Sequence, residues 1–128
     1  MKLLLDTHTF LWWATDPAKL SPHVLALCQN RSVDLMVSVV SLWEIQIKAQ
    51  LGKLTLTTSI PALITIQQQI NRIHILPVEL VHVLQLNALP LHHKDPFDRL
   101  LAAQAICENA SFATADPIST LYPVIIVW

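Results

Sequence analysis

The stretch HHKDPFDRLLAAQA, residues 92–105, contains the start of a helix. Asp95 suits the N-cap position and Pro96 suits the first helical position. Asp98 then falls at the third helical position, where a carboxylate stabilises the positive end of the helix dipole. The same side of the helix continues with Leu101, and a carboxylate on an apolar side needs a partner. Asp98 is therefore either a helix-dipole acid or a member of a polar site.

Outward from this helix, short apolar runs alternate with stretches of helical character. Strands are expected at residues 2–5, 34–40, 74–76, 110–114 and 123–127. Helices are expected at residues 8–14, 21–29, 39–51, 59–71, 78–87 and 96–109. Strands separated by helices indicate an α/β fold with a central, mostly parallel sheet. The chain has 128 residues and no internal repeat or linker, so a single domain over residues 1–128 is expected.

The composition excludes several classes of protein. Hydrophobic residues make up 53% of the chain and charged residues 13%, which is not the composition of a disordered segment. No apolar run approaches the roughly 18 residues of a membrane helix, and Asp6 interrupts the apolar start before it reaches the length of a signal peptide. A cytoplasmic protein is expected, with some apolar surface covered by a second copy or a partner. Cys28 and Cys107 are expected to be buried thiols rather than a disulfide.

Two acids follow strands directly. Asp6 comes after the run 2–5, and Asp116 comes after the run 110–114. In open parallel sheets, functional sites lie outside the carboxyl ends of the strands, which makes both residues candidates. Each also has a structural interpretation, Asp6 as the N-cap of the next helix and Asp116 as a turn residue before Pro117.

Glu44 lies in the middle of the helix predicted from VSVVSLWEIQIKAQLGK, residues 37–53. Val40 and Ile47 share its side of the helix, so its surroundings are largely apolar. Lys48 lies one turn further on, and an exposed pair of this kind contributes only about a few tenths of a kcal/mol. A buried, unpaired carboxylate would cost several kcal/mol or stay protonated. A surface Glu–Lys pair and a buried functional acid are the two alternatives.

Taken together, these acids indicate a metal site. Carboxylates that converge on one cleft repel one another unless a positive charge lies among them. Carboxylate and water ligands suit Mg²⁺ or Mn²⁺, and the absence of a Cys/His ligand set argues against zinc. One such ion, or two roughly 4 Å apart, would activate water for attack on a phosphate ester.

Four blocks of the chain resemble the PIN-domain family, specifically the VapC-like toxins of bacterial type II toxin–antitoxin pairs. They are LLLDTHTFLWW (3–13), VSVVSLWEIQIKAQLGKL (37–54), HKDPFDRLLAAQA (93–105) and FATAD (112–116). The resemblance implies a PIN-like three-layer α/β/α sandwich. It also implies a Mg²⁺- or Mn²⁺-dependent endoribonuclease that hydrolyses RNA phosphodiester bonds with metal-activated water. Many relatives carry a glycine after the tyrosine of the tail STLYPVIIVW (119–128), and this chain does not.

The resemblance also implies roles for individual residues and partners. The acidic cluster carried over by position is catalytic and holds the metal, and it comprises Asp6, Glu44, Asp98 and Asp116. Thr7 and Thr114 match polar positions beside the cluster that hold a ligand or a water. Asp95 matches a recurrent residue, which we interpret as the helix cap or as a residue that supports the metal ligands or positions a water. The implied partners are an RNA substrate, a cognate antitoxin that presents a basic side chain to the carboxylates, and a second copy of the chain.

Several basic residues flank the acids. Lys48, Lys94 and Arg99 are candidates for contacts with RNA phosphates, with solvated helix ends or ion pairs as the alternative. The adjacent His92 and His93 suggest a metal pair or an RNA contact, but sequence neighbours rarely share a metal without a third partner. The net charge of −1 gives no basic footprint for nucleic acid, although a local patch is compatible with it.

Two other function classes are weighed against the nuclease. One is a signalling module that binds Mg²⁺ in its acidic pocket and accepts phosphate on an aspartate. The other is a non-catalytic module whose acidic pocket binds a cation or a basic segment of a partner. A nucleotide-binding P-loop is excluded because the chain has a single glycine, Gly52.

Overall fold

The computed structural model describes residues 1–93 and 95–128. Its strands are β1 (Lys2–Leu5), β2 (Asp34–Ser38), β3 (His74–Leu76), β4 (Ser111–Ala113) and β5 (Ile126–Val127). Its α-helices are α1 (Thr7–Thr15), α2 (Pro22–Gln29), α3 (Val39–Gln50), α4 (Ile60–Gln69), α5 (Leu80–Gln85) and α6 (Pro96–Cys107). Short 3₁₀ helices are η1 (Pro17–Lys19), η2 (Leu86–Ala88) and η3 (Pro117–Leu121).

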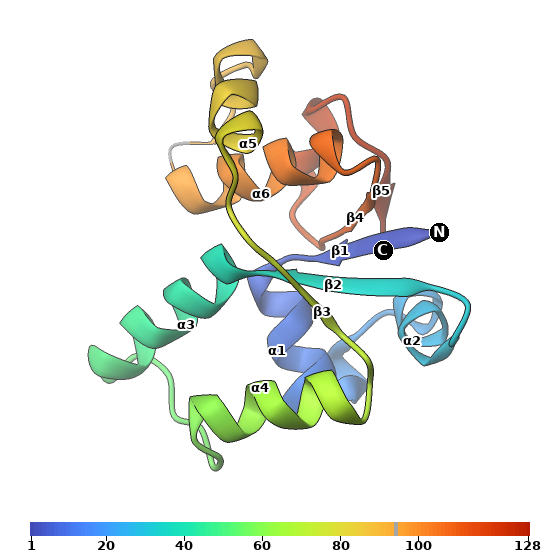
Figure 1. The fold of residues 1–128 in the computed structure, drawn as a ribbon, viewed down its shortest axis with the longest axis vertical. Coiled ribbons are helices and arrows are strands. Elements are labelled where there is room, and N and C mark those ends of the chain that lie inside the picture. Colours follow the sequence, from blue (N-terminus) through green and yellow to red (C-terminus); the bar gives the residue numbers. More distant parts are fainter. Residues whose placement is uncertain (94) are drawn as a thin grey trace.

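The sheet is parallel throughout, with the strand order β3-β2-β1-β4-β5. The chain moves from β1 outward to β2 and β3, then returns to the other side of β1 and adds β4 and β5. Right-handed crossovers in opposite directions place their helices on opposite faces of a sheet. Accordingly, α1, α2 and α4 lie on one side of the sheet in Figure 1, and α5 and α6 lie on the other. The predicted three-layer α/β/α sandwich is confirmed.

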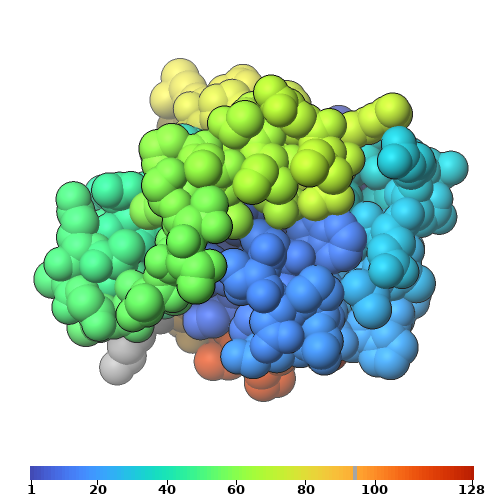
Figure 2. Space-filling model, turned by 90° about the horizontal axis from the view of Figure 1, so that it is seen from below, coloured from blue at the N-terminus to red at the C-terminus, as the bar shows by residue number. Residues whose placement is uncertain are grey.

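Both faces of the sheet are buried, because side chains alternate between them along each strand. Leu3 and Leu5 of β1 pack with Phe10 of α1 in one core cluster. Leu4 points to the opposite face and packs in a second cluster with Leu101 of α6. Phe10 of α1, Val24 of α2 and Leu63 of α4 belong to the first cluster, and the segments of these helices form the face seen from below in Figure 2.

Polar side chains start the helices that carry the candidate acids. Asp6 accepts a hydrogen bond from the backbone N–H of Thr9 and caps α1. Asp95 accepts from the backbone N–H of Phe97 and caps α6. These bonds satisfy N–H groups that have no partner within the helix. The capping roles predicted for Asp6 and Asp95 are confirmed, and both caps lie at the carboxyl edge of the sheet.

Three predicted strands are too long, because 110–114 shortens to β4 (Ser111–Ala113), 123–127 shortens to β5 (Ile126–Val127), and 34–40 shortens to β2. The expected strand 34–40 and the expected helix 39–51 overlap at residues 39–40, and the structure assigns both residues to α3, with β2 ending at Ser38. The Ser38 hydroxyl accepts from the backbone N–H of Val40, so the two valines after it form the first turn of α3. β-Branched residues favour strands only weakly, and here the cap decides the conformation.

Two expectations drawn from composition can be compared with the structure. Cys28 and Cys107 are both free thiols, but only Cys28 is buried. Within residues 1–93 and 95–128, no helix has the length and apolar character needed to cross a membrane.

Gly52 ends the helix that carries Glu44 and Lys48. Its φ is +71°, a left-handed conformation that residues with a Cβ rarely adopt. The N–H of Gly52 donates to Ala49 O over 3.2 Å, and the N–H of Lys53 donates to Lys48 O over 2.9 Å. This pair of bonds is the Schellman motif, which satisfies the last carbonyls of a helix.

Substitution of Gly52 by alanine is expected to lower the free energy of unfolding by about 1 kcal/mol, because alanine resists positive φ. No atom lies within 4 Å of the position that a Cβ would take, so the cost comes from the backbone alone. Urea unfolding of Gly52→Ala beside Gly52→Asn measures it. Asparagine tolerates this conformation and should cost less, and equal losses would contradict the account.

Candidate functional site

The carboxyl ends of β1 and β4 open onto an acidic cavity. These neighbouring strands lie at the point where the chain reverses its direction across the sheet, the usual position of a site in this class of fold. The cavity has a volume of about 290 Å³. It is lined by Asp6, Thr7, His8, Glu44, Lys48, Asp95, Asp98 and Asp116. All four predicted cluster acids are among these residues.

Asp6 joins β1 to both α1 and β4. Its side chain caps α1, and its backbone N–H donates to Ala113 O of β4 over 3.1 Å. The backbone at the mouth of the cavity is therefore fixed by hydrogen bonds on either side of the Asp6 carboxylate.

Glu44 is held by two side chains. It is 8% exposed, and the Thr7 hydroxyl donates to its Oε1 over 2.7 Å. Lys48 Nζ lies 3.0 Å from its Oε2, and the lysine side chain is 34% exposed. The Glu–Lys pair considered from the sequence is therefore present, but it is a buried carboxylate with a half-buried lysine. Thr7 connects α1 to α3 through this contact.

Asp98 enters the cavity from the first turn of α6. Its pKa is raised to about 6, mainly by burial and also by the negative charges of Asp95, Glu44 and Asp6, while His93 acts in the opposite direction. Burial is the largest cause of this shift, and the neighbouring acids act in the same direction, so ionisation of Asp98 is disfavoured in the absence of a cation.

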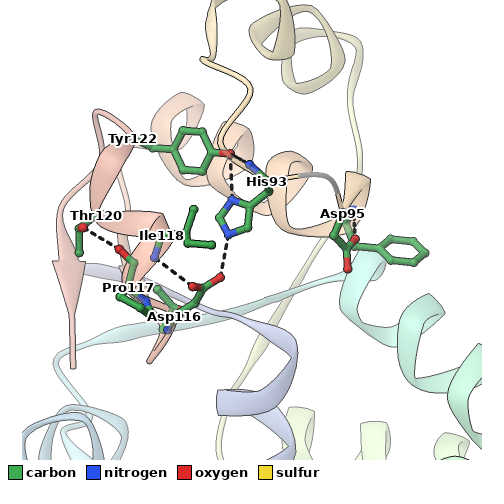
Figure 3. Close-up of polar contacts among 9 residues, drawn as sticks. His93, Asp95, Asp116, Pro117, Ile118, Thr120 and Tyr122 are labelled. Carbon is green, nitrogen blue, oxygen red and sulfur yellow. Dashed lines mark hydrogen bonds and ion pairs between the residues drawn. The ribbon is translucent and has the colours of Figure 1, made fainter.

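Asp116 is positioned by a turn and by a histidine. Its backbone N–H donates to Thr114 Oγ1 over 3.1 Å, and its Oδ1 accepts from the backbone N–H of Ile118 over 3.0 Å, the cap of η3. Its Oδ2 lies 2.7 Å from His93 Nε2. Burial raises the pKa of Asp116, but the hydrogen bonds from His93 and Ile118 outweigh this effect, and the pKa lies below its usual value. Figure 3 shows Asp116 between the histidine and the turn.

Comparison with known protein families agrees with the resemblance seen in the sequence. The PIN domain family model matches residues 3–119. The chain belongs to the PIN-domain family. PIN domains are nucleases, which are hydrolases.

Solved structures with low sequence identity share the fold of this PIN domain. VapBC2 from Rickettsia felis, bound to a DNA fragment from its promoter, has a TM-score of 0.73 at 18% identity, covering 99% of this chain and 98% of the other. DNA-bound VapBC from Salmonella typhimurium has a TM-score of 0.68 at 17% identity, with coverages of 99% and 97%. FitAcB from Neisseria gonorrhoeae has a TM-score of 0.63 at 18% identity, with coverages of 98% and 96%. The search of curated proteins gives no match.

The residues expected beside the acids differ in what they contact in this PIN domain. Thr7 donates to the Glu44 carboxylate, and Thr114 accepts from the Asp116 backbone. Asp95 lines the cavity and caps α6.

The three predicted basic residues have separate outcomes. Lys48 lines the cavity and pairs with Glu44. Arg99 points its guanidinium at backbone carbonyls, 3.0 Å from Leu86 O and 3.3 Å from Pro90 O. Lys94 falls outside the described residues.

The sequence did not predict that His93 lies beside the acidic cluster. One atom each of His93, Asp98 and Asp116 lie within 4.8 Å of one another, close enough to share a cation. The histidine pair in HHKDP was visible, but its partners Asp116 and Tyr122 lie 23 and 29 residues away along the chain. No local signal in the sequence distinguishes the buried His93 from the exposed His92.

The cavity of this PIN domain suits a hard divalent cation. Five of its lining residues are acids, and one is a lysine, already engaged with Glu44. Oxygen donors of this kind are the ligands that Mg²⁺ and Mn²⁺ prefer. The raised pKa of Asp98, caused first by burial and then by the neighbouring acids, is the shift that a bound cation would reverse.

The pKa of Asp98 predicts how the stability of the metal-free protein depends on pH. Between its ordinary pKa of 3.8 and about 6, the folded state binds more protons than the unfolded state. The free energy of unfolding should therefore fall as the pH rises through this window. Asp98→Asn cannot ionise and lacks this component, so its stability relative to the unaltered protein should improve from pH 4 to pH 7. Urea unfolding in chelator at several pH values measures the difference, and a constant difference would contradict the assignment.

Proposed function

We propose that this PIN domain is a divalent-metal-dependent endoribonuclease that acts as the toxin of a toxin–antitoxin pair in the cytoplasm. The observation that supports it most strongly is the cavity, where acids from four separate segments meet at the carboxyl edge of the sheet. These segments are the end of β1, the middle of α3, the first turn of α6 and the loop after β4. A structural role alone does not require acids from all four places to meet.

In this proposal Asp6, Glu44, Asp98 and Asp116 hold Mg²⁺ or Mn²⁺. A bound ion of this kind supplies Lewis-acid chemistry, lowering the pKa of water and stabilising negative charge on a phosphate ester. The protein's own contribution is to fix the carboxylates. Thr7 holds Glu44 through a 2.7 Å hydrogen bond, and Thr114 holds the turn of Asp116. Residues fixed in this way lose little freedom when the ion binds.

Basic side chains complete the proposed RNA site. Lys48 is 34% exposed at the cavity, where its ammonium group can neutralise an RNA phosphate. Lys94 remains a candidate for the same role. Arg99 is the weaker candidate, because its guanidinium already donates to the carbonyls around η2.

An antitoxin is the proposed protein partner. The similar solved structures include VapBC from two bacteria and FitAcB. The pairing of Lys48 with Glu44 shows that this cavity accommodates an ammonium group. A basic side chain of the antitoxin would bind the free carboxylates in the same way and exclude the metal.

A homodimer is also proposed. α5 exposes apolar side chains to solvent, with Leu80 72% and Leu84 63% exposed. Exposed apolar surface of this kind is commonly covered by another chain. A second copy would reduce this exposure.

The nuclease proposal is tested by incubating the purified, antitoxin-free protein with a mixed cellular RNA pool. Discrete fragments are expected with Mg²⁺ or Mn²⁺ and none with chelator, and the fragment ends identify the target. Persistence of the same fragments in chelator would contradict metal dependence. Absence of cleavage by folded protein in every metal would favour the non-catalytic module that binds a cation or a basic segment.

A further inference from the structure

His93 lies in a fully paired polar chain next to the acidic cavity. The residue is 8% exposed, and its backbone N–H donates to the Tyr122 hydroxyl over 3.1 Å. The same hydroxyl lies 2.8 Å from His93 Nδ1, and His93 Nε2 lies 2.7 Å from Asp116 Oδ2. The two rings stack with centroids 5.3 Å apart and planes inclined by 20°. Figure 3 shows the line of contacts from Tyr122 through His93 to Asp116.

The Tyr122 hydroxyl determines which ring nitrogen carries the proton. Its oxygen already accepts from the His93 backbone, and its proton has His93 Nδ1 as its acceptor among the described residues. Donation to Nδ1 leaves Nε2 as the protonated nitrogen, which donates to the Asp116 carboxylate. The other tautomer would leave the hydroxyl proton of Tyr122, 3% exposed, without an acceptor and would place two lone pairs opposite each other at Asp116.

We propose that His93 is a positioning residue, oriented by Tyr122, that holds Asp116 in the metal site and is not itself a metal ligand. The inference rests on the proposed function, because it assigns a role within that same site. A nitrogen that carries a proton has no lone pair for a cation, so the chain from Tyr122 directs Nε2 to Asp116. Residues that orient a metal ligand through a hydrogen bond commonly change metal affinity by about 10- to 100-fold when they are removed.

Asp116 needs such a contact because the cap of η3 holds only one of its two carboxylate oxygens. Its side chain is 34% exposed, and Oδ1 is used by the cap of η3. Oδ2 has His93 as its hydrogen-bond partner among the described residues. Without His93, rotation of the carboxylate would turn this oxygen toward solvent.

The test is the affinity for Mn²⁺, measured by calorimetry on the full chain. His93→Ala is expected to weaken binding by about 10- to 100-fold. His93→Gln, whose amide N–H can donate from a similar position, should recover most of the affinity. Tyr122→Phe should give a smaller loss, because Nε2–H can remain but the ring is no longer fixed. His23→Ala, which removes an exposed histidine on α2, should bind as the unaltered protein does.

Thermal unfolding of each variant establishes that it is folded, and His93→Gln keeps the test valid if His93→Ala is not. Pulsed electron paramagnetic resonance of bound Mn²⁺ is expected to detect no directly coordinated histidine nitrogen. Coordination by such a nitrogen, or equal Mn²⁺ affinity of His93→Ala and the unaltered protein, would overturn this inference alone. Failure of the unaltered protein to bind Mn²⁺ would overturn the proposed function and the inference with it.

Discussion

Asp98→Asn is expected to reduce metal-dependent RNA cleavage by about a thousand-fold. A bound metal ion contributes several kcal/mol to stabilising the transition state of phosphate-ester hydrolysis, and about 4 kcal/mol corresponds to this factor. Asparagine keeps the shape of the side chain but removes the charge that attracts the ion. The variant should remain folded at neutral pH, because the ionised Asp98 is disfavoured by burial and by neighbouring acids. Initial rates of cleavage at saturating Mn²⁺ measure the effect.

The matched control is Asp34→Asn. Asp34 is an exposed acid at the start of β2, at the opposite edge of the sheet from the cavity. It carries the same change of charge and should cleave as the unaltered protein does. Equal rates for Asp98→Asn and Asp34→Asn would remove Asp98 from the metal site.

Asp6 is expected to show two separable roles. Asparagine caps helices about as well as aspartate, so Asp6→Asn should change the free energy of unfolding little. Alanine cannot accept from the N–H of Thr9, so Asp6→Ala should lower the free energy of unfolding by about 1 kcal/mol. Both variants remove the charge at the cavity and should lose cleavage by about a hundred-fold or more.

Unfolding and cleavage are measured on the same preparations of the two Asp6 variants. If Asp6→Asn cleaves RNA normally while Asp6→Ala is destabilised, Asp6 is a cap and nothing else. If both are equally destabilised, the 2.8 Å contact with Thr9 is not the source of the capping energy.

The sequence predicted the fold well where local chemistry decides it. Asp6 and Asp95 predict the starts of α1 and α6, because a side-chain acceptor before an apolar stretch is a local signal for a helix N-terminus. The alternation of strands and helices predicted the parallel sheet, and the strand ends predicted where the acids would meet. The extent of β2 was wrong because Ser38, a cap, lies inside an apolar, β-branched run.

Contacts between distant segments could not be read in this way. Arg99 follows Asp98 and resembles a phosphate ligand, yet it donates to the carbonyls of Leu86, Leu89 and Pro90, which lie 9 to 13 residues earlier. Asp116 and Tyr122 contact opposite nitrogens of the His93 ring, and only the tertiary fold brings these distant segments together. Glu44 was predictable only in part. The apolar side of its helix predicted its burial, but its hydrogen-bond partner Thr7 lies 37 residues away in the sequence.

The central claim is that these acids hold a divalent cation, and a crystal structure of the antitoxin-free protein grown with Mn²⁺ tests it most directly. An anomalous difference peak is predicted in the cavity at about 2.1 to 2.2 Å from carboxylate oxygens of the cluster, with His93 Nε2 still donating to Asp116. A peak elsewhere, or a cavity without manganese in crystals that contain it, would contradict the account.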